Sequence, residues 1–204
     1  MKHKILFAGC ILFAALALGV GSLLAKQQAL ADKMIRFHVV ANSDSDEDQQ
    51  NKLAVRDALL EDIADMAASS TGREDMAQKI QEVLPSLREK AEETLQKLHC
   101  NMPVAVTLQE EAFPTRYYPT FTLPAGNYLS LRVQLGQGEG HNWWCVCFPS
   151  LCTGACAGDL EEIAAGAGFS ADEVDWITKE DDYVLRFKIL EWMQEVKSHL
   201  GSMD

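Results

Sequence analysis

The sequence lacks the short motifs that accompany common enzyme chemistries. It contains no G-x-S-x-G, no H-E-x-x-H and no G-x-x-x-x-G-K-[ST], so serine hydrolases, zinc proteases and phosphate-binding loops lose their usual support. The glycine run Gly136-x-Gly138-x-Gly140 precedes a Trp-Trp strand and no helix, so no helix N-terminus is present to hold a phosphate. We therefore predict no catalytic residue, no metal, no cofactor and no small-molecule substrate.

Basic residues are scarce. The 204 residues include 18 Lys and Arg against 30 Asp and Glu, a formal charge of -12. Nucleic-acid binding depends on basic patches that release counterions, so a nucleic-acid partner is not expected. The acidity favours solubility and disfavours adhesion to anionic membranes.

The N-terminus has the layout of an export leader. Lys2 and Lys4 precede an apolar run from Ile5 to Ala25, and Ala29 and Ala31 offer an A-x-A-like cleavage site. The run is also long enough to span a bilayer. Residues 1–31 are thus predicted to be a signal peptide or an N-terminal membrane anchor, with the rest of the chain outside the cytoplasm.

The pattern from residue 32 to residue 149 predicts an α+β domain with a mostly antiparallel sheet packed against two or three helices. Residues 34–40, where Arg36 and His38 interrupt an apolar stretch, are expected to form a half-buried strand. Apolar residues at helical spacing predict helices over 53–68 and 76–98, and alternation predicts strands over 104–108, 129–135 and 143–148. The last two strands, separated by the glycine run, are expected to pair as a hairpin.

The composition of the chain changes after residue 149. Residues 150–170 are rich in Gly, Ala and Cys and are expected to be a linker. Ser170 and Glu173 form a capping box at the start of a predicted amphipathic helix over 171–204. Its apolar stripe consists of Leu185, Ile189, Trp192, Val196 and Leu200.

The acidic run Asp44-x-Asp46-x-Asp48 has two interpretations. The spacing resembles the start of a calcium loop, but the twelfth position is Val55, where an EF-hand needs a bidentate Glu. Short polar side chains and negative charge also favour a helix N-terminus. Helix capping is the better account of this run.

Four of the six cysteines form the cluster Cys145-x-Cys147-x4-Cys152-x3-Cys156. The spacing departs from the paired C-x-x-C knuckles of structural zinc, and disulfides are permitted outside the cytoplasm, so a Cys145–Cys152 disulfide is favoured over a metal. His141 and Cys145 make a base and nucleophile pair conceivable, but no third group nearby orients the histidine. An extracytoplasmic thiol or metal enzyme built on this cluster, or a membrane-anchored structural or adhesion domain, remains an alternative.

Several long segments resemble a known family. Ile35-Arg-Phe-His-Val-Val-Ala-Asn-Ser-Asp-Ser-Asp-Glu-Asp-Gln-Gln50, Phe113-Pro-Thr-Arg-Tyr-Tyr118, Leu123-Pro-Ala-Gly-Asn-Tyr128 and Leu135-Gly-Gln-Gly-Glu-Gly-His-Asn-Trp-Trp-Cys-Val-Cys-Phe-Pro149 are similar, in this order, to the central pattern of the stage II sporulation protein R family. Val184–Trp192 is similar to the family's C-terminal stretch. Cys147 and Cys156 are additions to the family's cysteine pair.

The resemblance implies a signal and not an enzyme. Such a protein is made in the forespore, is exported into the space between the two membranes of the sporangium, and activates a membrane-embedded aspartic peptidase that processes the precursor of sigma factor E. Motif density and expected exposure make Asn42, Asp44, Asp46, Trp143 and Trp144 the candidate partner-binding residues. The two tryptophans are expected on opposite sides of one strand.

Overall fold

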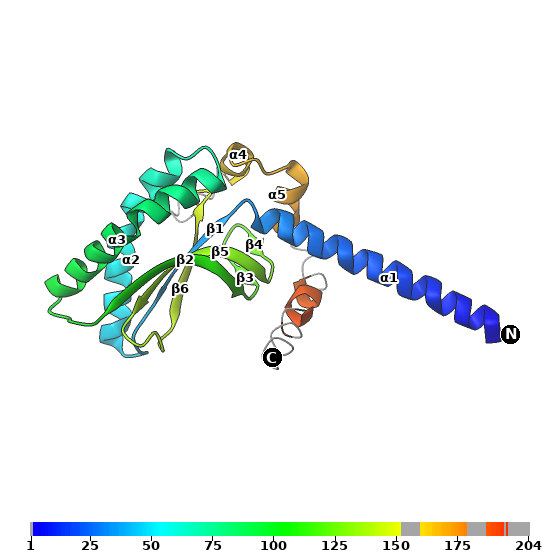
Figure 1. Cartoon of the computed structure of the whole chain (residues 1–204), viewed down its shortest axis with the longest axis horizontal. Coiled ribbons are helices and arrows are strands. Elements are labelled where there is room, and N and C mark those ends of the chain that lie inside the picture. Colours follow the sequence, from blue (N-terminus) through cyan, green and yellow to red (C-terminus); the bar gives the residue numbers. More distant parts are fainter. Residues whose placement is uncertain (1, 152–159, 179–186, 194, 196–204) are drawn as a thin grey trace.

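A computed structural model of the chain describes residues 2–151, 160–178, 187–193 and 195 (Figure 1). The helices are α1 (Lys2–Ala31), α2 (Asp46–Ala68), α3 (Arg73–Lys97), α4 (Leu160–Gly166) and α5 (Ala171–Thr178). The strands are β1 (Ile35–Val40), β2 (Val104–Phe113), β3 (Arg116–Tyr117), β4 (Thr122–Leu123), β5 (Gly126–Leu135) and β6 (Asn142–Phe148). The predicted α+β class is confirmed.

The main sheet has the strand order β2-β5-β1-β6. β1 pairs parallel with β5 and antiparallel with β6, and β2 pairs antiparallel with β5, so the sheet is mixed but mostly antiparallel. β3 and β4 form a separate two-stranded sheet. The predicted hairpin of the last two strands is wrong, because β1 lies between β5 and β6.

Helices α2 and α3 cover one face of this sheet (Figure 1). Ser45 caps α2, its hydroxyl accepting from the Asp48 backbone N–H, and three acidic residues occupy the first turn, where the helix dipole favours them. The buried side chains between the helices and the sheet include Ile35, Phe37, Val55, Leu59, Ile63, Ile80, Leu87, Leu95, Leu131 and Val133. The helical spacing of the apolar residues therefore predicted this core correctly.

Strand β1 is buried along its whole length, unlike the half-buried strand expected from the alternation. Its odd-numbered residues face α2 and α3, while Arg36 and His38 lie on the other face and are 0% and 4% exposed. The alternation was real, but the second face of a central strand is covered by other parts of the chain. Two polar side chains are thus buried in the middle of the sheet.

The segment from Gly136 to His141 passes over the end of β1 to reach β6. Asn42, just after β1, accepts a hydrogen bond from the Gln137 N–H through its side chain (3.0 Å), and its backbone carbonyl accepts from the Glu139 N–H (3.2 Å). Asp44 accepts from the His141 N–H at 2.6 Å. These bonds fix the crossover, which takes the place of the predicted hairpin turn.

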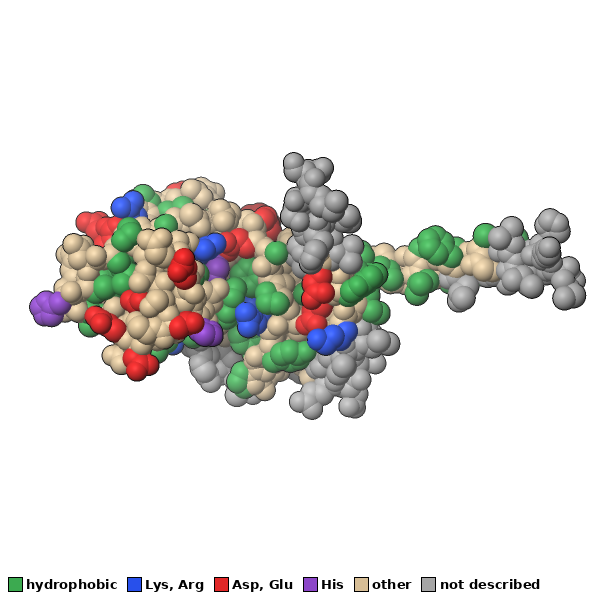
Figure 2. Space-filling model, turned by 90° about the horizontal axis from the view of Figure 1, so that it is seen from below, with side chains coloured by type: hydrophobic (Ala, Val, Ile, Leu, Met, Phe, Trp, Pro, Cys, Tyr) green, Lys and Arg blue, Asp and Glu red, His purple; other side chains and the backbone are tan. Residues whose placement is uncertain are grey.

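The N-terminal helix α1 extends away from the domain as a single rod (Figure 1). Its window Gly9–Ala31 has a mean hydropathy of 1.9 and is the one span in the described chain apolar and long enough to cross a membrane, a test that signal sequences also pass. Hydrophobic side chains lie along the rod, and acidic ones are dispersed over the domain (Figure 2). The end of the helix is different, because Leu30 and Ala31 are buried in a second core with Met34, Phe113 and Tyr128.

The C-terminal part is described in two helical pieces. The Ser170–Glu173 capping box is present, with reciprocal bonds of 2.7 and 3.3 Å, and helix is described over α5 and again over residues 187–193. There Phe187 and Leu190 are buried, whereas Trp192 of the predicted stripe is 64% exposed. Leu185, Val196 and Leu200 lie outside the described residues. Helix α4 occupies part of the stretch expected to be a linker.

The crossover yields a stability prediction. A Cβ at Gly140 would meet the Ser43 carbonyl oxygen, a backbone atom that cannot move aside cheaply. Gly140→Ala should therefore destabilise the domain by about 1–3 kcal/mol, the range for overpacking. Gly166→Ala, where a Cβ meets nothing within 4 Å at the end of α4, should be neutral or stabilise by up to about 1 kcal/mol. Urea unfolding of both variants tests this, and equal losses would contradict the role of the crossover.

Candidate functional site

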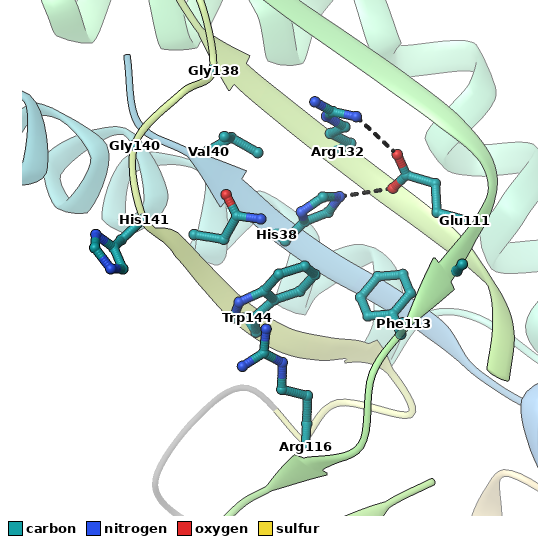
Figure 3. A pocket seen from close by; sticks show the side chains of 12 residues that line it. His38, Val40, Glu111, Phe113, Arg116, Arg132, Gly138, Gly140, His141 and Trp144 are labelled. Atoms are coloured by element: carbon teal, nitrogen blue, oxygen red, sulfur yellow. Dashed lines mark hydrogen bonds and ion pairs between the residues drawn. The ribbon is translucent and has the colours of Figure 1, made fainter. Parts of the chain in front are cut away.

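A cleft of about 650 Å³ opens on the sheet face that α2 and α3 do not cover (Figure 3). It is lined by His38, Val40, Glu111, Ala112, Phe113, Arg116, Arg132, Gly138, Gly140, His141, Asn142 and Trp144. These residues come from β1, β2, β5, β6, the crossover and the start of β3. Strand alternation places the charged and aromatic side chains on this face because their apolar neighbours face the helices.

Glu111 forms the polar centre of the cleft. One of its carboxylate oxygens lies 2.8 Å from His38 Nε2, and the other accepts from Arg132 Nη1 at 3.2 Å (Figure 3). Burial by itself raises the pKa of this carboxyl, but the hydrogen bonds from His38 and Arg132 outweigh burial and lower its pKa to about 2. Glu111 is therefore ionised at neutral pH and holds three neighbouring strands together.

Aromatic rings form the wall of the cleft beside this ionic group. The His38 ring stacks on Trp144 at 4.7 Å with an interplanar angle of 6°, and Phe113 meets Trp144 edge-on at 5.0 Å. The Arg116 guanidinium also lies over the Trp144 ring, 4.4 Å from its centroid. Stacking of this kind stabilises a cation and fixes its orientation.

Arg36 lies beneath the aromatic wall. It is fully buried, its guanidinium lies 4.4 Å from the Phe113 ring centroid and 5.1 Å from that of Tyr128, and it donates to the Tyr118 hydroxyl at 2.9 Å. Among the described residues no carboxylate lies within ion-pair distance of Arg36, and its Nη1 has no hydrogen-bond partner. Ring faces therefore replace a counter-ion.

Two of the three polar candidates, Asn42 and Asp44, hold the crossover in place. Asn42 and Asp44 bind the crossover backbone as described above, and Asp44 also bonds the His141 ring. The bonds from the His141 backbone and side chain lower the Asp44 pKa. Asp46 is exposed in the first turn of α2. Partner binding by these three residues stays a prediction.

Trp143 and Trp144 do lie on opposite faces of β6. Trp143 packs edge-on against Phe37 at 5.7 Å on the helix-covered face, with Arg56 over its ring, while Trp144 lines the cleft. Both are partly buried. Trp144 is thus the predicted candidate that the structure brings into the cleft.

Two of the four clustered cysteines, Cys145 and Cys147, lie within the described residues. Cys145 is buried, and its predicted partner Cys152 lies outside the described residues, so the disulfide stays a prediction. Cys147 is a free thiol on the helix-covered face, and burial raises its pKa to about 12. A thiol with this pKa is a poor nucleophile at neutral pH. Within the described ranges no three His, Cys, Asp or Glu side chains are placed to hold a metal.

Sequence reasoning missed the residues that form the site: Arg36, His38, Glu111, Arg116 and Arg132. One signal was present, because Arg36 and His38 alternate with apolar residues in a stretch too hydrophobic for an edge strand. No local pattern joins Glu111 or Arg116 to that stretch. Glu111 reaches His38 only because β2 pairs with β5 and β5 pairs with β1, and Arg116 follows β2 in the chain.

The fold and this cleft define a small α+β domain, carried by an apolar helix, with a polar site on the open face of its sheet. The family model for Stage II sporulation protein R matches residues 31–157. The Stage II sporulation protein R of Bacillus subtilis (strain 168) is 32% identical over 187 residues, covering 83% of this chain and 84% of the relative. The chain belongs to the stage II sporulation protein R family, whose members are sporulation signalling proteins. No solved structure matches it.

The Glu111 network makes a pH prediction. The folded-state pKa is depressed to about 2 from 4.5, so the stability that it contributes is present above pH 4.5 and is lost as pH falls toward 2. Glu111→Gln should therefore lose about 1–3 kcal/mol at pH 7, the range for a buried charged hydrogen bond. The difference from the unsubstituted protein should shrink between pH 4.5 and pH 2, as urea unfolding at several pH values would measure.

The matched control is Glu139→Gln, an exposed carboxylate on the crossover. Its effect should stay within about 0.5 kcal/mol at every pH. A Glu111→Gln effect that does not depend on pH would contradict the ionised network.

Proposed function

We propose that this chain is an exported sporulation signal, made in the forespore, that activates the membrane-embedded aspartic peptidase processing the precursor of sigma factor E. The observation that carries the proposal is membership of the stage II sporulation protein R family along most of the chain. The activity and the partner come from what the family resemblance implies. The domain is compatible with this role because its cleft and crossover offer a shaped surface for a partner.

The proposed location is the space between the two membranes of the sporangium. Support comes from α1, which is apolar, carries Lys2 and Lys4 at its start and projects from the domain (Figure 1). The positive-inside rule places the short N-terminal flank in the cytoplasm and the domain outside. In that compartment a Cys145–Cys152 disulfide is permitted.

Activation also sets a physical requirement. A binding protein shifts an enzyme toward its active state only by binding that state more tightly than the inactive one. The domain is therefore proposed to bind the active conformation of the peptidase preferentially, and the peptidase provides the catalytic groups.

Reconstitution tests the activation. The chain is co-expressed with the matching peptidase and its sigma precursor, with and without the apolar run Ile5–Ala25, and precursor cleavage is followed on a gel. Cleavage that requires the exported chain is the expected result. No cleavage in the presence of an exported, folded chain would sink the proposal and return attention to the cysteine cluster as a site of a thiol or metal enzyme.

We further propose that α1 stays attached as an anchor. Cleavage after Ala31 would remove Leu30 and Ala31, which are 0% and 1% exposed, from the second core. Losing a buried Leu costs about 2–5 kcal/mol. Intact mass of the protein recovered from sporulating cells should include α1, whereas a mature N-terminus at Asp32 would contradict retention.

A further inference from the structure

One of the cationic side chains that line the cleft, Arg116, lacks a carboxylate partner among the described residues. Glu111 is already engaged by both His38 and Arg132, and His141 at the rim is engaged by Asp44. Arg116, by contrast, has no carboxylate within ion-pair distance in the part of the chain that the structure describes. In a chain with a net charge of -12, such a cationic cleft stands out against the rest of the surface.

Arg116 is held in a defined position. Its side chain extends from the segment after Phe113 toward Trp144 (Figure 3), and its guanidinium stacks on the indole at 4.4 Å. Its Nε is buried without a hydrogen-bond partner. A buried, unpartnered polar atom costs about 1–3 kcal/mol, so this arrangement gives up stability in the absence of an acceptor.

A second unneutralised cation reinforces the first. Burial lowers the pKa of Arg116, and the nearby positive charge of Arg36 lowers it further. Arg36 is also without a carboxylate among the described residues and has an unpartnered Nη1. The two guanidinium groups, Arg116 stacked on Trp144 and Arg36 against Phe113, create a positive potential that an anion entering the cleft would relieve.

The shape of the cleft indicates the kind of anion. A guanidinium is a planar fork that matches a carboxylate in two parallel hydrogen bonds. The volume of about 650 Å³ is much larger than one carboxylate and falls in the range of cavities that hold drug-sized ligands. The rings of Trp144 and Phe113 offer contact for the adjoining chain of a peptide.

The charge of the chain argues against a lipid headgroup. With a net charge of -12 the chain is repelled by anionic membranes, so a protein segment is the better carrier of the anion.

We propose that the cleft between Trp144, Phe113 and Arg116 is a docking site for a carboxylate carried by an extended segment of a protein partner. The carboxylate is an acidic side chain or a C-terminal carboxylate, and it pairs with Arg116 while its chain packs on the rings. That the carrier belongs to the peptidase rests on the proposed function. The site itself rests on the geometry of the cleft.

The direct test follows the Trp144 indole N–H signal by NMR in the ¹⁵N-labelled full chain in detergent micelles, assigned with Trp144→Phe. The probe is the blocked pentapeptide acetyl-Gly-Gly-Glu-Gly-Gly-amide. The same peptide with Gln, a blocked-N-terminus pentaglycine with a free carboxylate, and inorganic phosphate are compared with it. A saturable shift with one or both carboxylate peptides and none with the Gln peptide is expected, and the two carboxylate peptides distinguish the two sources.

Variants assign the shift to Arg116. Arg116→Gln should weaken peptide binding about tenfold or more, the loss expected when one partner of a desolvated charge pair is removed. The matched control Arg88→Gln removes an exposed arginine that pairs with Glu92 on α3 and should bind as the unsubstituted chain does. An equal shift with the Gln peptide, a response to phosphate alone, unchanged binding by Arg116→Gln, or no shift with any carboxylate peptide at 10 mM (about the upper end of a millimolar Kd) would overturn the proposal.

Reconstitution separates this proposal from the proposed function. If the unsubstituted chain drives precursor cleavage, Arg116→Gln should lower it about tenfold while Arg88→Gln leaves it unchanged. Equal cleavage with both variants would overturn docking of the peptidase at Arg116 but leave the activating function standing. If the unsubstituted chain drives no cleavage, the function fails and the peptide titration alone decides the site.

Discussion

Strand β1 lies at the centre of the sheet, and its two polar side chains set the constraint on which the open face depends. Arg36 and His38 are buried with almost no exposure, so each needs partners within the domain. His38 obtains Glu111, and Arg36 obtains the rings of Phe113 and Tyr128. Two of these partners, Glu111 and Phe113, also line the cleft.

The central position of β1 also explains the crossover. With β1 between β5 and β6, the connection between those strands must pass over its end, where Asn42 and Asp44 follow directly in the chain. Glycine at position 140 allows the crossover to approach the Ser43 backbone. The segment after β1 and the glycine run therefore bind each other and together form the rim of the cleft.

The sequence predicted local features well and pairing poorly. The apolar stripes of α2 and α3, the α+β class and the Ser170–Glu173 capping box follow from spacing over a few residues, and all three are present. The hairpin was wrong because a glycine run between two strands indicates a turn but not which strand lies next to which. Trp144 was found as an aromatic residue in a dense motif, whereas Glu111 and Arg116 reach the cleft only through the sheet order. The apolar stripe of the C-terminal helix stays a prediction, because Leu185, Val196 and Leu200 lie outside the described residues.

Hydrogen–deuterium exchange of the full chain, alone and bound to the peptidase, would test most directly whether the open face is the partner surface. We expect added protection in residues 111–118 and 142–146, at the wall of the cleft, and little change in α2 and α3, whose sheet-facing side chains are already buried. Added protection confined to α2 and α3, with residues 111–118 unchanged, would contradict the account and place the partner on the other side of the sheet.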